Sequence, residues 1–207
     1  MSSEPAGDPD TRRRILDAAL RLIDQRGGAD ITLAQVGRAA KVSRQAVYLH
    51  FKDRAGLLLA LVRHADDRRG LPAAIQRVVG ASSGVSALRE MAMTQVTMNP
   101  GIWRLARLFD GERRHDPAME QSWQDRLSHR LEGCRAIVAR LAAEGDLRRG
   151  LDPGVAADLL WVITSLHAWE DLVLVRGWSD DEYLARVTGA LSDLLLEPGR
   201  RRAAAGV

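Results

Sequence analysis

A short polar stretch in the first third of the chain has the residue types and the spacing needed to contact DNA. Arg44, Gln45 and Tyr48 lie at positions i, i+1 and i+4, so one face of a helix would present all three. Arginine can bind O6 and N7 of guanine with two hydrogen bonds, and glutamine can do the same with N6 and N7 of adenine. Val47 and Phe51 lie four residues apart on another face, which would pack on the domain. This pattern predicts a helix that presents polar side chains to the major groove.

Further polar groups in the same stretch suit the DNA backbone. Tyr48, His50 and Lys52 offer hydrogen-bond donors for phosphate oxygens. Thr32 and Ser43 are each expected at a helix N-terminus, where a hydroxyl and free backbone N–H groups favour an anion. For Arg44 and Gln45 the alternative is a solvated face, and for His50 a capping or core histidine.

Three helix starts close together would position these groups. Thr32 begins a capping box with a glutamine three residues later and opens a helix of about 33–40. Ser43 is an N-cap candidate for a helix of about 44–50, and Asp53 for the helix that follows. Helices this short, together with the first helix of the chain, predict a compact helix-turn-helix unit.

Here the sequence resembles the TetR family of bacterial transcriptional regulators over roughly residues 10–60. The run Tyr-Leu-His-Phe-Lys at 48–52, after a serine-capped turn, is the most specific feature of the resemblance. The other matching residues are Thr32, the helix 36–40, Val42, Ser43, Leu57 and Leu58, with Ile15, Ala18, Ala19, Leu22 and Gly27 upstream. The resemblance implies a homodimer, an operator-binding N-terminal domain, and an all-helical C-terminal domain that holds a small-molecule pocket and the dimer interface.

The resemblance also implies roles for individual residues. Arg44 and Gln45 would read bases, and Ala46 could contact a thymine methyl group. The implied DNA-binding residues are Thr32, Ser43, Arg44, Gln45, Tyr48, His50, Lys52 and Arg54. Arg12, Arg13 and Arg14 could follow the DNA backbone or form a charged face.

Two positions depart from the family pattern. Lys41 stands at the turn where glycine is usual, and Gly37 where alanine is usual. A positive φ at Lys41 would carry a strain of roughly 1 kcal/mol. Either the turn avoids that conformation, or a phosphate contact by Lys41 offsets the strain. Gly37 should weaken its helix by roughly 0.5–1 kcal/mol relative to alanine, and could allow close approach of the neighbouring helix.

The whole chain reads as all-α, with an N-terminal three-helix helix-turn-helix domain, a larger C-terminal helical bundle domain and about nine helices in total. The expected domains are residues 10–65 and 66–197, between disordered tails at 1–9 and 198–207. Asn99-Pro100-Gly101 is expected to break a helix that begins near Ser86. Later helices are expected at about 117–144, 153–176 and 179–196.

The C-terminal region offers candidates for an effector site. All five Trp residues lie after residue 100, and Met and Trp adapt to irregular apolar ligands. The candidate ligand-binding residues are Met91, Gln95, Met98, Trp103, Trp161, Thr164 and His167. The alternative is that the tryptophans form core or interface. The effector itself is unidentified and is expected to be largely apolar.

Dimerisation is expected through the helices at about 153–176 and 179–196, which carry more apolar surface than one monomer needs. Two such helices from each subunit would make a four-helix bundle. One recognition helix contacts only a few base pairs, so specificity favours two half-sites.

Composition excludes disulfide-stabilised and membrane-spanning classes of protein. The chain has 207 residues, of which 46% are apolar, and one cysteine, so no disulfide forms within it. No apolar run is long enough for a membrane span. Residues 1–64 hold 11 Lys and Arg against 7 Asp and Glu, whereas residues 65–199 hold 16 against 20. A basic N-terminal part joined to an acidic remainder indicates that one of them faces an anion.

No catalytic or metal-ligating motif stands out, so we expect neither an enzyme, nor a cofactor, nor a metal site. The leading hypothesis is a cytoplasmic, nucleoid-associated homodimeric repressor, released from a palindromic DNA operator by a small-molecule effector. The alternative is a helical small-molecule-binding or scaffold protein without operator binding. Repression and activation differ by operator position, which the residues do not encode.

Overall fold

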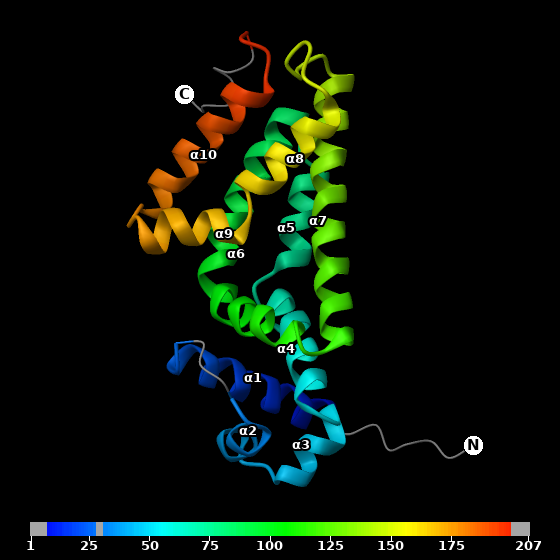
Figure 1. The fold of residues 1–207 in the computed structure, drawn as a ribbon, viewed down its shortest axis with the longest axis vertical. Helices are drawn as coiled ribbons and strands as arrows, with labels where there is room; N and C mark the ends of the chain where they lie inside the picture. The colour runs from blue at the N-terminus through cyan, green and yellow to red at the C-terminus, as the bar shows by residue number, and fades with distance from the viewer. Residues whose placement is uncertain (1–7, 28–30, 200–207) are drawn as a thin grey trace, which may run out of the picture. The chain divides into compact units, whose positions relative to one another are not determined.

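The computed structural model describes residues 8–27 and 31–199, and within them the fold is all-α, as the sequence predicts. These residues form ten α-helices and one π-helical segment (Figure 1). The helices are α1 (Pro9–Gln25), α2 (Leu33–Ala40), α3 (Arg44–Phe51), α4 (Arg54–Arg68), α5 (Leu71–Val79), α6 (Gly84–Arg113), α7 (Pro117–Ala143), α8 (Pro153–Ile163), α9 (Leu166–Trp169), the π segment η1 (Glu170–Val175) and α10 (Asp180–Leu195). None of the described helices is both long and apolar enough to cross a membrane.

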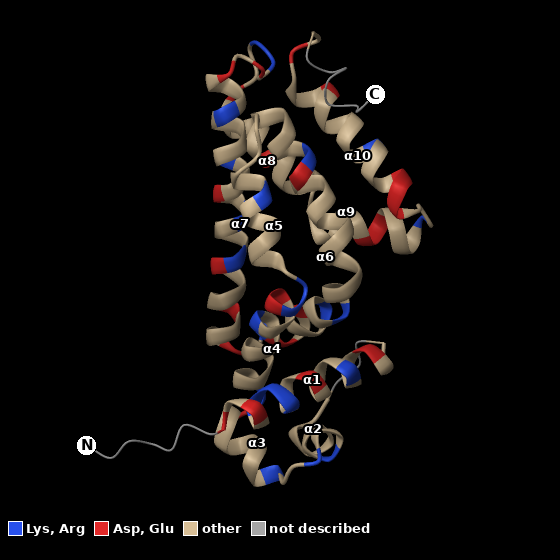
Figure 2. Cartoon of the chain, turned by 180° about the vertical axis from the view of Figure 1, so that it is seen from behind, with Lys and Arg blue, Asp and Glu red and all other residues tan. Residues whose placement is uncertain are grey.

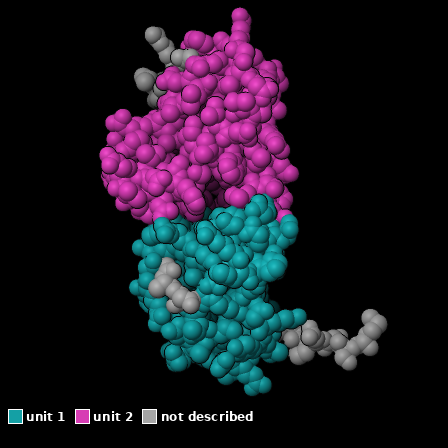
Figure 3. Space-filling model, in the orientation of Figure 1, with its two compact units in different colours: residues 1–69, 102–124 teal, residues 70–101, 125–207 magenta. Residues whose placement is uncertain are grey.

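The chain divides into two compact units (Figure 3). The N-terminal unit comprises the chain up to Arg69 together with Ile102–Gln124. The C-terminal unit comprises Gly70–Gly101 together with the chain from Asp125 onward. The sequence predicts a single boundary near residue 65, whereas the N-terminal unit also takes in a later segment. Helices α6 and α7 therefore contribute residues to both units.

Side-chain caps begin the helices of the N-terminal unit where the sequence predicts them. The Thr32 hydroxyl accepts from the amide of Gln35 at 3.2 Å, and the Gln35 side chain accepts from the amide of Thr32 at 2.9 Å. Ser43 Oγ accepts from the Ala46 amide at 3.0 Å, and Asp53 caps α4 in the same way. The local sequence thus sets where α2, α3 and α4 begin.

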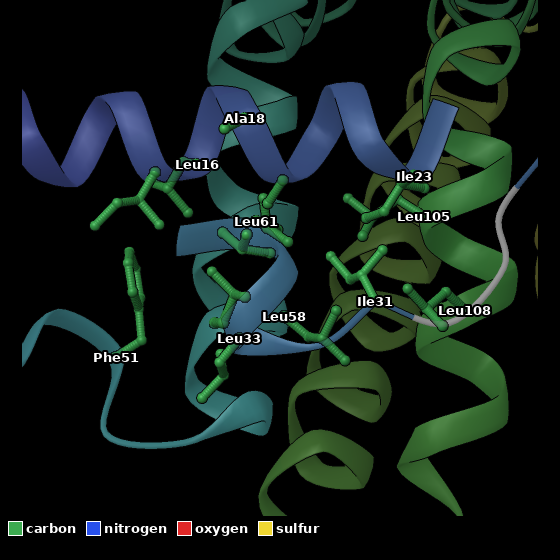
Figure 4. Close-up of a cluster of buried hydrophobic side chains, with 14 of the residues drawn as sticks. Leu16, Ala18, Ile23, Ile31, Leu33, Phe51, Leu58, Leu61, Leu105 and Leu108 are labelled. Carbon is green, nitrogen blue, oxygen red and sulfur yellow. The ribbon is translucent and has the colours of Figure 1, made fainter. Parts of the chain in front are cut away.

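The core of the N-terminal unit lies where α1, α2, α3 and α4 meet. Figure 4 shows Leu105 and Leu108 of α6 close to Ile23 and Ile31, so the later segment completes this core. All four of these side chains are buried, and each fully buried large apolar side chain contributes about 1.5–3 kcal/mol. This burial explains why residues 102–124 belong to the N-terminal unit.

The expected break at 99–101 is wrong, because α6 runs through Pro100 without interruption. A proline inside a helix removes one hydrogen bond and costs about 3 kcal/mol. Met98 and Asn99 are buried before the proline, and Leu105 is buried after it. Packing on both sides of Pro100 outweighs the local preference.

The expected continuous helix at 153–176 is also wrong. α8 ends at Ile163, and Thr164 is its C-cap. Ser165 Oγ then accepts from the Ala168 amide at 3.0 Å and starts α9, which leads into η1. Ser165 is a local N-cap signal that the apolar periodicity conceals.

The expected tails fall mostly outside the described residues. Of the predicted tails at 1–9 and 198–207, residues 1–7 and 200–207 lie outside the described part of the chain. The last two residues of the N-terminal segment are ordered parts of α1. Asp8 is its N-cap and accepts from the amide of Thr11 at 3.0 Å, and Pro9 is its first residue.

Candidate nucleic-acid interface

Helix α3 separates its polar and apolar side chains onto different faces. Arg44, Gln45 and Tyr48 are exposed, whereas Val47 and Phe51 are buried in the core of the N-terminal unit. The exposed side chains come from the first five residues of the helix, directly after the Ser43 cap. This is the arrangement that the sequence predicts for a helix that enters a DNA groove.

Two of these side chains hold each other in place. The Tyr48 hydroxyl accepts a hydrogen bond of 3.0 Å from Nη2 of Arg44, and the guanidinium lies 5.2 Å from the centre of the tyrosine ring. That hydrogen bond raises the pKa of Arg44, so its charge is secure. The pair limits the conformations of both side chains, and ordering them before binding reduces the entropy lost in a complex.

The turn before α3 contains backbone strain. Lys41 has φ 55° and ψ 44°, the left-handed conformation that glycine adopts easily. Its amide donates to the carbonyl of Arg38 at 3.2 Å, and the amide of Val42 donates to the carbonyl of Gly37 at 2.9 Å. Of the two alternatives for this turn, the structure therefore excludes the one in which the turn avoids positive φ.

Gly37 allows the close approach that its position suggests. A Cβ atom there would lie 3.3 Å from the carbonyl oxygen of Val42 and 3.4 Å from Cγ2 of Val47. Both neighbours belong to the turn or to the buried face of α3. The missing side chain thus lets α2 and α3 pack at short range.

The turn after α3 is tighter still, and it depends on Gly56, which was not among the predicted site residues. Lys52 has φ 58° and ψ −53°, and the Asp53 amide donates to the carbonyl of Phe51 at 2.5 Å across it. This is a γ-turn of the rare, strained type. A Cβ at Gly56 would lie 2.3 Å from the same Phe51 carbonyl, so only glycine fits there. The signal that could have identified Gly56 is its place in the first turn of a helix. Glycine lowers helix propensity there, with no gain that the local sequence explains.

The remaining predicted DNA contacts differ in how accessible they are. Thr32, Ser43 and Lys52 are exposed, and the first two act as helix caps. His50 is half-buried, with its ring centre 6.0 Å from that of Phe51.

Arg54 is engaged inside the N-terminal unit. Its guanidinium donates to the carbonyl of Ile31 and forms an ion pair of 3.0 Å with Glu112. A DNA phosphate would therefore have to compete with the Ile31 carbonyl and the Glu112 carboxylate for the Arg54 guanidinium.

Basic residues of α1, α2 and α3 lie around this surface (Figure 2). The guanidinium of Arg12 lies 5.2 Å from the centre of the Phe51 ring, and Arg13 pairs with Asp10 at 2.8 Å. The start of α1 is thus next to the end of α3, which adds positive charge beside the predicted phosphate contacts His50 and Lys52.

Three of the predicted ligand-binding residues meet around a residue that was not predicted. Arg130 of α7 donates to the carbonyl and hydroxyl oxygens of Thr164, both at 3.2 Å, and to the carbonyl of Trp161 at 2.5 Å. Its guanidinium lies 4.7 Å from the centre of the Trp161 ring. Met91 Sδ lies 4.0 Å from Thr164 Oγ1 and 3.9 Å from the Cys134 thiol.

Burial shifts the titration of this cluster. It lowers the pKa of Arg130, raises that of Cys134 to about 11 and raises that of Tyr183 to about 12. The Tyr183 hydroxyl is buried without a hydrogen-bond partner among the described residues. The cluster is thus a polar interior within the helical C-terminal unit. An arginine half-way along a long helical pattern gave no sequence signal for it.

The other predicted ligand-binding residues lie elsewhere. Gln95 accepts from Asn99 Nδ2 at 3.3 Å, Met98 is buried and His167 is exposed. Trp103 belongs to the N-terminal unit, unlike the other six. Within the described part of the chain, no three His, Cys, Asp or Glu side chains group as metal ligands would.

Comparison with known proteins decides the family. Residues 15–61 match the model of the bacterial regulatory proteins of the tetR family. The chain is 30% identical over 152 residues to the nucleoid occlusion factor SlmA of a Marinomonas species, covering 70% of this chain and 73% of that protein. This chain belongs to the TetR family. It is a DNA-binding transcriptional regulator with an N-terminal helix-turn-helix.

Solved structures of two transcriptional regulators share the fold over nearly the whole chain. A regulator from Saccharomonospora viridis in complex with choline superimposes with a TM-score of 0.79 at 17% identity, over 92% of this chain and 100% of that one. SmeT, the repressor of a multidrug efflux pump of Stenotrophomonas maltophilia, superimposes with a TM-score of 0.64 at 25% identity, over 91% of each chain. The likeness of fold thus extends to the C-terminal helices.

Proposed function

We propose that this TetR-family regulator is a homodimeric repressor that binds a palindromic operator and is released from it by a small-molecule effector. The observation that carries the proposal is the exposed face of α3, on which Arg44, Gln45 and Tyr48 follow a capped N-terminus while Val47 and Phe51 anchor the helix. SmeT, which shares the fold, is the repressor of a multidrug efflux pump. We further propose that the protein acts in the cytoplasm, on the nucleoid.

Exposed apolar side chains support the proposed dimer interface. Val155 and Val162 of α8 are each 50% exposed, Val175 of η1 is 71% exposed and Leu194 of α10 is 38% exposed. A shallow groove of about 420 Å³ between α7 and α8 is lined mainly by apolar residues, among them Leu131. The four exposed residues fall within the two segments expected to pair, 153–176 and 179–196. The first segment consists of three helical pieces, α8, α9 and η1. Apolar surface of this kind favours burial against a second copy.

The cluster around Arg130 is the best candidate for the effector region. It brings together Met91, Trp161 and Thr164, and the buried Tyr183 hydroxyl offers a hydrogen bond to a ligand. Apolar surroundings with a few polar groups suit a largely apolar small molecule. Release requires that the effector binds the DNA-free conformation more tightly than the DNA-bound one.

Selection of bound DNA from a random pool is the direct test of operator binding. We expect a palindromic site with affinity that falls steeply with salt. In gel shifts on that site, Tyr48→Ala should weaken binding by tenfold or more, and Lys52→Ala should reduce the salt slope by about 1 per protomer. Arg63→Ala, an exposed change on α4, should behave as the parent.

The alternative function predicts different results. A helical binding or scaffold protein without operator binding would enrich no sequence and would give gel shifts that Tyr48→Ala leaves unchanged. For the effector, Trp161→Phe should keep operator affinity and lose release by the active members of a panel of apolar compounds and choline. Unchanged release would place the effector site elsewhere.

A further inference from the structure

One large apolar side chain on α3 has most of its surface outside the core. Leu49 is 61% exposed, although the same helix carries the buried Val47 and Phe51. Among the described residues of the N-terminal unit, Leu49 and Tyr48 are the large hydrophobic side chains that are exposed. Tyr48 holds Arg44 through its hydroxyl, whereas Leu49 has no polar group to use in this way. The packing of the unit therefore does not account for an apolar residue at this position.

Leu49 lies on the side of α3 opposite the core. Successive helical residues are rotated by about 100°, so Leu49 lies about 160° from both Val47 and Phe51. Leu49 follows Gln45 by four residues, so the two side chains share one face and are about 6 Å apart along the helix axis. Gln45 is exposed and is a predicted base reader. Leu49 thus extends the predicted base-reading face by one helical turn.

The chemistry of a leucine limits what it can recognise on DNA. Its side chain has no hydrogen-bond donor or acceptor, so it bonds neither to phosphates nor to the polar edges of bases. The apolar group that base pairs present in the major groove is the C5 methyl of thymine. Helix formation does not require leucine here, because lysine, glutamine and arginine form helices about as well and would be better solvated.

We propose that Leu49 reads the C5 methyl group of a thymine in the operator, which makes it a specificity-determining residue of α3. The inference rests on the proposed binding of operator DNA by this helix. Base pairs follow one another at about 3.4 Å, so 6 Å along α3 corresponds to about two base pairs. The thymine therefore lies within about two base pairs of the base that Gln45 reads. Ala46, which the sequence suggests for such a contact, is half-buried and has a much shorter side chain.

Replacing single thymines by deoxyuridine tests the contact with the parent protein, because this change removes only the C5 methyl group. The DNA is the site that the parent selects from a random pool, and gel shifts measure the affinity. We expect one position in each half-site at which deoxyuridine weakens binding about fourfold, the effect of exposing one buried methyl group. At that position Leu49→Ala should bind the thymine and deoxyuridine sites equally, because the methyl group has lost its partner.

A second selection gives a readout that a loss of stability would not produce. The pool bound by Leu49→Ala should lose the preference for thymine at that position and keep the preference that Gln45→Ala removes. The matched control is Ile75→Ala on α5, which shortens a 50% exposed apolar side chain by the same number of carbons. It should select the parent site and show the parent's sensitivity to deoxyuridine. Circular dichroism checks that each variant is folded.

The outcomes separate this inference from the proposed function. If the parent selects a site but deoxyuridine weakens Leu49→Ala as much as the parent at every thymine, Leu49 does not read a methyl group and the inference alone is overturned. The same holds if Leu49→Ala selects the parent site unchanged. If the parent enriches no sequence at all, operator binding fails and the inference fails with it.

Discussion

Replacing Lys41 by glycine should make the protein more stable, although it removes a charged side chain from the proposed DNA-binding unit. Lys41 has φ 55° and ψ 44° at the end of α2. For a residue with a Cβ, this conformation costs roughly 1–2 kcal/mol, whereas glycine adopts it freely. Glycine also gains about 0.4–1 kcal/mol of entropy in the unfolded chain, which opposes the stabilisation. The net expectation is about 0.5–1 kcal/mol in favour of glycine.

The matched control is Lys41→Ala, which removes the same charge and keeps the strain. The two variants differ only in the Cβ, so their difference reports the conformational term. For a chain of this length, 0.5–1 kcal/mol corresponds to a difference in Tm of about 1–4 °C. Thermal unfolding followed by circular dichroism measures it. If Lys41→Gly melts no higher than Lys41→Ala, the backbone is not strained at this turn and the reasoning is wrong.

The same two variants test whether Lys41 contacts phosphate. Each phosphate contact contributes about 0.9 to the slope of log affinity against log salt. A contact by Lys41 would therefore lower the slope of a dimer by about 2 in both variants, whatever their stability. An unchanged slope would show that the lysine does not touch the DNA backbone, and that the strain is not offset by that contact.

Three other predictions concern different parts of the chain. Gly56→Ala places a Cβ 2.3 Å from the Phe51 carbonyl oxygen and should destabilise the protein by about 1–3 kcal/mol in urea unfolding. Partial burial raises the pKa of Asp17, but hydrogen bonds led by that from His64 outweigh it and leave the pKa lowered. The ionised Asp17 therefore stabilises the fold above about pH 4, and this contribution is lost as the pH falls through the lowered folded pKa. Cys134 is fully buried with its pKa raised to about 11, so at pH 8 a disulfide reagent should label it more than about 100-fold more slowly in native than in unfolded protein.

Each of these predictions has its own control. Gly111→Ala adds a Cβ in open space within α6 and should raise stability by about 0.5–1 kcal/mol, opposite in sign to Gly56→Ala. Asp17→Asn should flatten the fall of Tm below about pH 4, and a parent-like acid profile would contradict the assigned ion pair. Labelling of Cys134 at equal rates in the native and unfolded protein would contradict its burial.

The sequence alone determined the parts of the N-terminal unit that depend on residues a few positions apart. The Thr32 capping box and the Ser43 and Asp53 caps begin helices where they were predicted. The separation of Arg44 and Gln45 from Val47 on α3 follows from the helical period. Local hydrogen bonds and periodicity are encoded locally, so they can be read without knowledge of the fold.

Only the tertiary structure decided where long-range packing outweighs a local preference. Pro100 stays inside α6 because buried residues on both sides of it keep the helix continuous. Arg54 has the position of a phosphate contact in the sequence but pairs with Glu112, which is 58 residues away. Arg130 likewise meets Thr164 across 34 residues. Contacts over such separations depend on how helices pack, and helix packing follows from the summed burial of many side chains rather than from any one motif.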